Sequence, residues 1–222
     1  MSIASLGVAC IGRSPAPLPI AEPGELASRL SARSTPREPQ LIEVKWRYRG
    51  RDGRFAGDGA VRVNPPDSVR LDLLGPGWSG VQSAVLLGDE LHYVGEQRVT
   101  LPPPMFLWAM LGVFRPPAGI VPKGSLRGDR SQLGYDLSER ERVIFEFDGV
   151  GRLVEAERQV GGHAVQEVRI TRDATANSST WPKEARFRDL GEFHEVRVQV
   201  TKTRVHAPFE RDVFDVAAHL PS

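Results

Sequence analysis

The side chains that could carry chemistry in this chain are few and scattered. Its 222 residues include five histidines and one cysteine. No two histidines have a metal-ligand spacing such as H-x-x-x-H, and none lies near Cys10 in the sequence. There is no G-x-S-x-G nucleophile motif, no phosphate-binding P-loop and no G-x-G-x-x-G that opens a helix. The histidines are His92, His163, His194, His206 and His219.

One histidine has a carboxylate beside it, but the two are badly placed for acid–base catalysis. Glu195 follows His194 in a predicted strand, and consecutive side chains of a strand point to opposite faces. Other carboxylates stand at polar strand positions, where a solvated surface is their ordinary role. They are Asp58, Asp72, Glu146 and Glu155. We therefore expect no enzyme, and neither a metal nor a cofactor.

The composition limits the partners. The chain has 29 Lys and Arg residues against 28 Asp and Glu residues, so we expect no nucleic acid partner. No apolar run approaches the ~18 residues that a membrane-spanning helix needs. With 40% hydrophobic residues, the chain can bury a sizeable core, as one large all-β domain or two smaller ones.

The single cysteine stands at an informative position. Small residues precede Cys10, and a loose Pro-rich and Ala-rich segment follows it, which resembles the end of a bacterial lipoprotein signal. In such a signal the cysteine becomes the lipid-bearing first residue. The segment lacks the usual basic start and is short, as it would be if translation began further upstream. We interpret residues 1–24 as a truncated signal-like segment and linker, with lipid attachment at Cys10; the alternative is a free cysteine in a disordered tail.

Most of the chain alternates between apolar and polar residues, which predicts β-strands. A short amphipathic helix is expected at residues 25–33, and from Leu41 onward the period is two. The pattern gives about ten strands joined by short turns, so they should pair antiparallel. A single sheet of that size must curl or close. Gly57 and Gly59 remove side chains from one apolar face, which either bends that strand or opens space.

The hairpin at residues 68–87 has an unusual tip. Its expected apolar positions are Val69, Leu71 and Leu73 on one strand and residues 81, 83, 85 and 87 on the other. The connector Gly75–Gly80 carries Trp78, although a turn tip normally faces water. Either the tryptophan folds back onto the sheet, or it forms an exposed apolar tip that docks on a lipid surface. Its context, described next, favours the membrane-facing tip.

The β pattern breaks once. Residues 102–117 have nearly continuous apolar residues between prolines, and Gly112 stands where a helix would end. This predicts a short helix at residues 105–111 that is apolar on more than one side. Such a helix must be covered, or must itself cover something.

The hairpin and this helix together resemble the LolA/LolB family of bacterial lipoprotein carriers, with the outer-membrane lipoprotein receptor LolB as the nearer relative. The resemblance lies in Arg70-Leu-Asp-Leu-Leu-Gly-Pro-Gly-Trp-Ser-Gly80, in Phe106-Leu-Trp-Ala-Met-Leu-Gly112, and in Trp181-Pro182 before two strands around Gly191. It implies one domain over residues 25–222, an incompletely closed antiparallel β-barrel with short helices forming a lid over an apolar cavity. We expect Trp78 to be its membrane tip.

Site residues follow from the strand pattern and from the resemblance. The lid residues are Met105, Phe106, Trp108 and Ala109, with Leu26 and Leu30 as a second cover. The cavity residues are Trp46, Tyr48, Phe55, Val61, Leu71, Leu73, Val85, Tyr93, Phe145 and Val168. Whether these side chains enclose an open cavity or a packed core is left open by the sequence.

The implied function is to bind lipoprotein acyl chains and deliver them to the outer membrane. The expected partners are acyl chains or another lipid, the inner leaflet of the outer membrane and a periplasmic carrier protein, and we expect a monomer. The expected location is the outer membrane, facing the periplasm, with a soluble periplasmic form as the alternative. The rival interpretation is a lipid-binding sensor or scaffold of the envelope that carries no cargo. A hydrolase or isomerase that uses the cavity is the weaker third hypothesis.

Overall fold

The computed structural model describes residues 16–51, 53–75, 81–173 and 181–216. Within them, one antiparallel sheet of 13 strands runs in the order β1-β7-β8-β9-β10-β11-β12-β13-β2-β3-β4-β5-β6. The strands are β1 (Leu18–Pro19), β2 (Gln40–Gly50), β3 (Gly53–Asn64), β4 (Ser68–Leu74), β5 (Val81–Leu87), β6 (Glu90–Val94), β7 (Lys123–Arg127), β8 (Arg130–Asp136), β9 (Glu141–Phe147), β10 (Leu153–Val160), β11 (His163–Thr171), β12 (Glu184–Asp189) and β13 (His194–Val205).

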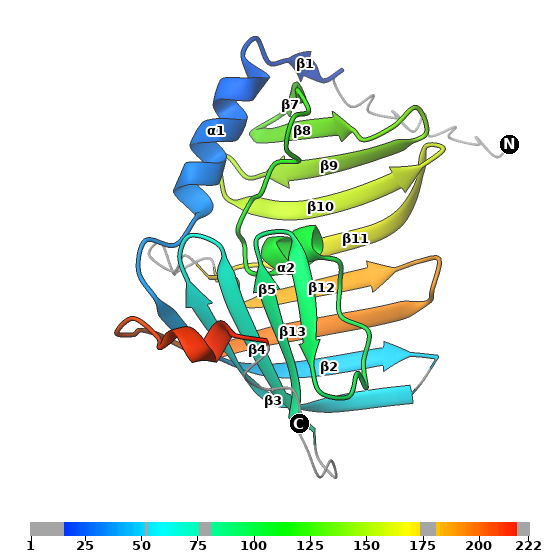
Figure 1. Cartoon of the computed structure of the whole chain (residues 1–222). Helices are drawn as coiled ribbons and strands as arrows, with labels where there is room; N and C mark the ends of the chain where they lie inside the picture. The colour runs from blue at the N-terminus through cyan, green and yellow to red at the C-terminus, as the bar shows by residue number, and fades with distance from the viewer. Residues whose placement is uncertain (1–15, 52, 76–80, 174–180, 217–222) are drawn as a thin grey trace, which may run out of the picture.

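The sheet curls round on itself without closing, because its two edge strands, β1 and β6, do not pair with each other. Figure 1 shows β4, β5 and β6 folded over in front of the rest of the sheet. Two helices accompany it, α1 (Pro23–Ser34) and α2 (Pro104–Met110), with a single 3-10 turn, η1 (Arg211–Phe214). The predicted class, a curled and incompletely closed antiparallel barrel with short helices, is confirmed.

The helices cover the inner side of the curl. The helix α2 packs against β10, β11 and β12, and Figure 1 shows it inside the curve of the sheet. The helix α1 begins at Pro23, a residue suited to the first turn. It buries Ala27 and Leu30, and its Ser34 hydroxyl accepts a hydrogen bond of 2.9 Å from the Phe114 N–H. No helix in the described ranges is long and apolar enough to span a bilayer.

Two short strands were not expected from the sequence. Leu18 and Pro19 form β1, which pairs with β7, although the composition of residues 11–24 indicates a linker. Both strands are too short to show a clear alternation. The two predicted helices are present, with ends that differ from the expected ones by at most two residues.

Gly57 marks a close approach of β3 and β4. A Cβ atom at this position would lie 1.7 Å from the carbonyl oxygen of Leu74, on β4. Trp46 stands opposite Gly57 in the β2–β3 register, and its indole N–H lies 3.1 Å from the carbonyl oxygens of both Asp58 and Leu74. The glycine therefore serves a close backbone contact, with the indole ring beside it.

Replacing Gly57 with alanine should lower the free energy of unfolding by about 2 kcal/mol or more, because the added methyl must push β3 away from β4. Urea denaturation measures the change. Gly24→Ala, in α1, is the control: nothing lies within 4 Å of a Cβ there, and alanine favours a helix. Equal stability of the two variants would contradict the close contact.

Candidate functional site

The inner face of the curled sheet is almost entirely apolar. Residues that pair directly across neighbouring strands share a face, and the registers connect the predicted wall residues in two rows. One row runs Phe55, Tyr48, Val196, Phe187, Val168, Ala156 and Phe145, and the other runs Val61, Leu71, Ala84 and Tyr93. Trp46 and Leu73 join the same face opposite Gly57 and Gly59.

Val85 is the exception and corrects the expected wall. It pairs with Arg70 and His92, so it lies on the outer face although it is fully buried. The cause is the hairpin register: Leu71 pairs with Ala84, and Leu73 with Gln82. The even-numbered residues of β5 therefore face inward, and the odd-numbered ones, which had been expected there, face outward.

The interior under α2 is nearly filled. It retains one apolar cavity of about 30 Å³, lined by Trp46, Val61, Val69, Leu71, Leu73, Leu86, Leu101, Leu107, Met110, Leu111, Val196 and Val198. That volume is close to the share of one water molecule in the liquid. The inner face is thus a packed core in this conformation, and a larger apolar ligand requires α2 to move.

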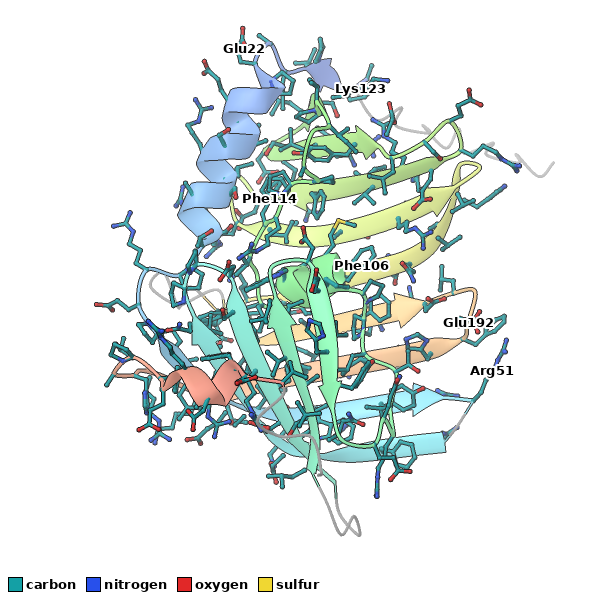
Figure 2. The ribbon with its side chains drawn as sticks, in the orientation of Figure 1. Glu22, Arg51, Phe106, Phe114, Lys123 and Glu192 are labelled. Atoms are coloured by element: carbon teal, nitrogen blue, oxygen red, sulfur yellow. The ribbon has the colours of Figure 1, made fainter. Side chains whose placement is uncertain are left out.

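The helix α2 is held from two sides. Phe106, Trp108 and Ala109 are fully buried, while Met105 is half-buried. The Phe106 ring lies 5.6 Å from that of Phe187 on β12, and Figure 2 labels Phe106 on α2, inside the curve of the sheet. On the opposite side, the Trp108 indole N–H donates a 2.8 Å hydrogen bond to the carbonyl oxygen of Gly88, between β5 and β6. The helix therefore connects β12, on one side of the curled sheet, with the β5–β6 turn on the other.

Arg115 covers the Trp108 side chain and adds a second contact between this part of the chain and the sheet. Its guanidinium lies 4.0 Å from the centre of the Trp108 ring and donates to the carbonyl oxygen of Pro66. Burial lowers the pKa of Arg115, while Asp67 and Asp89 act in the opposite direction. A cation stacked on an aromatic face stabilises it by about 0.5–2 kcal/mol. Arg115 thus helps to hold α2, the expected lid, against the sheet.

A second half of the interior is aromatic. Phe114 packs edge-on against Phe145 and Phe147, at 4.9 and 5.0 Å between ring centres, and Figure 2 places it between α1 and the sheet. Tyr135 joins this group, fully buried, and its hydroxyl has no hydrogen-bond partner among the described residues. Burial raises the pKa of Tyr135 to about 12.

The strand pattern did not reveal a polar cluster at one end of the inner face. Asp189 and His194 pair across β12 and β13, and Gln166 pairs with Asp189 from β11. The Gln166 amide donates to Asp189 at 2.6 Å, and the other carboxylate oxygen of Asp189 accepts the N–H groups of Gly191 and Glu192 at 3.0 and 2.7 Å. Burial alone would raise the pKa of Asp189, but these hydrogen bonds hold it below its ordinary value.

This cluster has the contacts of a turn cap. Both carboxylate oxygens of Asp189 are already used by donors, and the His194 Nε2 atom is buried without a hydrogen-bond partner in the described chain. Among all the residues that the structure describes, no three His, Cys, Asp or Glu side chains lie close enough together to hold a metal ion. Two other expected site residues, Cys10 and Trp78, lie outside the described ranges.

The fold and the interior define a class of protein, an unclosed antiparallel barrel whose apolar inner face is covered by a helix. No protein-family model matches the chain, and no curated protein matches its sequence. A LolA superfamily protein from Nitrosomonas europaea has a similar structure, with a TM-score of 0.59, 11% identity and coverage of 85% of this chain and 97% of that one. A DUF1329 family protein from Desulfovibrio piger is similar at a TM-score of 0.50 and 11% identity, over 91% and 99% of the two chains. The expected resemblance to the LolA/LolB family is confirmed at the level of the fold.

Tyr135→Phe should raise the free energy of unfolding by about 1 kcal/mol at neutral pH, because it removes a buried hydroxyl without a partner. Above pH 10 the difference should widen. The unfolded chain then releases the phenol proton while the folded chain keeps it, so the parent loses stability as the pH rises from about 10 toward 12.

Denaturation of parent and variant at several pH values measures both effects. Tyr93→Phe is the matched control, because the Tyr93 hydroxyl accepts a 3.0 Å hydrogen bond from the Leu101 N–H. Its loss should lower stability. A destabilised Tyr135→Phe variant would show that the hydroxyl has a partner after all.

Proposed function

We propose that this protein binds the acyl chains of lipoproteins inside its curled sheet and delivers them to the outer membrane. The observation that carries this proposal is the interior cavity, in which each of the lining side chains is apolar and a single short helix forms the cover. Acyl chains need a dry surface without fixed polar partners. Each CH₂ group that leaves water contributes about 0.8 kcal/mol.

Loading requires α2 to be displaced, since the cavity of about 30 Å³ has no room for a chain. Most of the displaced contacts are apolar, so an acyl chain can replace them with burial of the same kind. The contacts that oppose opening are the Trp108 hydrogen bond to Gly88 and the stacked Arg115 guanidinium. Once α2 moves away, water can take over the polar groups that these two contacts free.

The shared fold with a LolA superfamily protein supports the proposal. In the proposed scheme, Cys10 of this chain carries the lipid that anchors the protein in the outer membrane, on the periplasmic side. Trp78 is the apolar tip that meets the inner leaflet. The protein has no catalytic step and no cofactor in this scheme. The hydrogen bonds that occupy both oxygens of Asp189 support a structural role for the buried polar cluster.

The second candidate is an envelope lipid-binding sensor or scaffold that carries no cargo. The filled interior favours it, because a core that is already packed needs no ligand. Mass spectrometry of the protein extracted under mild conditions separates the two. A copurified acylated protein, the cargo itself, supports the carrier, and its absence supports the sensor or scaffold.

Leu111→Glu should weaken the binding of a fluorescent fatty acid about tenfold or more. The half-buried Leu111 lines the cavity, so a carboxylate there must be desolvated beside the acyl chain. Leu126→Glu, on the exposed strand β7, is the control and should bind normally, because Leu126 is 41% exposed. Unchanged binding by the Leu111 variant would place the acyl site elsewhere.

Trp78→Glu should leave folding and fatty-acid binding intact while it reduces transfer of an acylated protein to membranes, because a carboxylate resists entry into the interface. A transfer assay with outer-membrane vesicles measures the rate. The control is Leu87→Glu, at the opposite end of β5, where the side chain is 37% exposed. Normal transfer by the Trp78 variant would remove this tip from the mechanism.

A further inference from the structure

An exposed phenylalanine stands at the tip of another hairpin. Phe193, in the turn between β12 and β13, exposes 72% of its surface, and Leu190 in the same turn exposes 38%. Phe193 also has φ of 57°, a left-handed conformation that disfavours a bulky residue. A residue that tolerates this conformation, such as asparagine, would suit the turn better on stability alone. The stability of the fold therefore does not explain a phenylalanine at this position, and an external binding partner would.

The turn is held firmly in place. The Asp189 carboxylate accepts hydrogen bonds from the N–H groups of Gly191 and Glu192. Arg51, from the neighbouring β2–β3 turn, lies 3.7 Å from the Glu192 carboxylate and 5.9 Å from the centre of the Phe193 ring. Figure 2 shows Arg51 and Glu192 side by side at this end of the sheet. The apolar tip is thus presented in a fixed orientation, with a cation beside it.

A basic hollow lies next to this tip on the outer face of the sheet. It has a volume of about 530 Å³. Its lining consists of four arginines, one carboxylate and three further residues, namely Arg47, Arg49, Arg54, Arg197, Glu195, Tyr48, Phe55 and Ala56. The arginines stand opposite one another across the strands, Arg49 with Arg54 and Arg47 with Arg197. Like charges at directly opposite positions destabilise a sheet.

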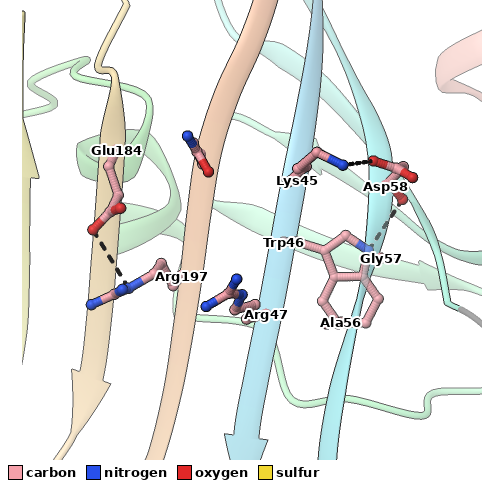
Figure 3. Close-up of a pocket in the computed structure, with 9 residues that line it drawn as sticks. Lys45, Trp46, Arg47, Ala56, Gly57, Asp58, Glu184 and Arg197 are labelled. Carbon is pink, nitrogen blue, oxygen red and sulfur yellow. Dashed lines mark hydrogen bonds and ion pairs between the residues drawn. The ribbon is translucent and has the colours of Figure 1, made fainter.

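Three of these arginines have no ion pair within the described residues. Arg197 lies 3.5 Å from Glu184, a contact drawn in Figure 3, which also shows Arg47 beside Arg197. No carboxylate oxygen of the described chain lies within 4 Å of the Arg47, Arg49 or Arg54 guanidinium. These groups are the ones that phosphate oxygens fit best, through paired N–H donors.

We propose that this end of the sheet binds an anionic phospholipid surface, with the Phe193 ring in the interface and the phosphate groups of the lipids in the arginine hollow. An aromatic tip beside clustered cations is the combination that favours the boundary between headgroups and acyl chains. The contact is on the outside of the sheet and needs no opening of the interior. It therefore goes beyond acyl binding and holds whether or not the cavity is loaded.

The test is sedimentation of the full chain, with Cys10→Ala to remove any attached lipid, on two kinds of vesicle. One kind is phosphatidylcholine alone and the other also contains phosphatidylglycerol. We expect tighter binding to the anionic vesicles, weakened by salt. Phe193→Asn and the double variant Arg49→Gln with Arg54→Gln should each weaken it about tenfold or more, and the double variant should also reduce the salt dependence.

Matched controls remove equivalent groups elsewhere. Val121→Asn replaces a side chain that is 84% exposed, and Arg37→Gln with Arg127→Gln removes two exposed arginines that have no ion pair in the described chain. Both should bind vesicles as the parent does. Asparagine tolerates the left-handed turn, so the melting midpoint of Phe193→Asn should not fall below that of the parent.

Three results would overturn the proposal. They are parent-like binding by the Phe193 and arginine variants, equal losses in the controls, and full competition by inorganic phosphate, which would indicate a site for the free anion. Fatty-acid binding by the same variants is measured in parallel. If the Phe193 and arginine variants bind both fatty acid and vesicles as the parent does, only the membrane contact is refuted. If the parent binds anionic vesicles but no fatty acid, only the carrier proposal is refuted.

Discussion

The structure depends on covering the inner face of a sheet that does not close. A curled sheet with free edges exposes its apolar side unless another element fills the curve, and α2 fills it with Phe106, Trp108 and Ala109, all fully buried. The hydrophobic burial that stabilises the fold is the same burial that a bound acyl chain would offer. The helix is therefore part of the core, and in the proposed function it is also the part that an acyl chain would displace.

The two halves of the interior suit different roles. Around Phe114, the rings of Tyr135, Phe145 and Phe147 interlock at ring distances of 4.9–6.5 Å, and such contacts are costly to break. Beneath α2 the wall is mostly aliphatic, and it encloses the apolar cavity of about 30 Å³. Opening at α2 would leave the aromatic half intact, so a change of state need not unfold the domain.

The sequence predicted the architecture well because alternation reports directly which residues face inward. It also predicted α2, since a run of apolar residues between prolines cannot continue the alternation. It failed where distant residues decide the outcome. The face of Val85 depends on the pairing across a connector, the Gln166, Asp189 and His194 cluster depends on three strands meeting, and the left-handed backbone of Phe193 leaves no mark in the pattern.

The edge of the sheet at β1 has a consequence for self-association. An unpaired edge strand is a template on which a second copy can add a strand of its own. Within the described residues the edge strand β1 consists of Leu18 and Pro19, and proline has no N–H with which to extend a ladder. The described margin of this unclosed sheet is thus blunted against the addition of further strands, as in growth into fibres.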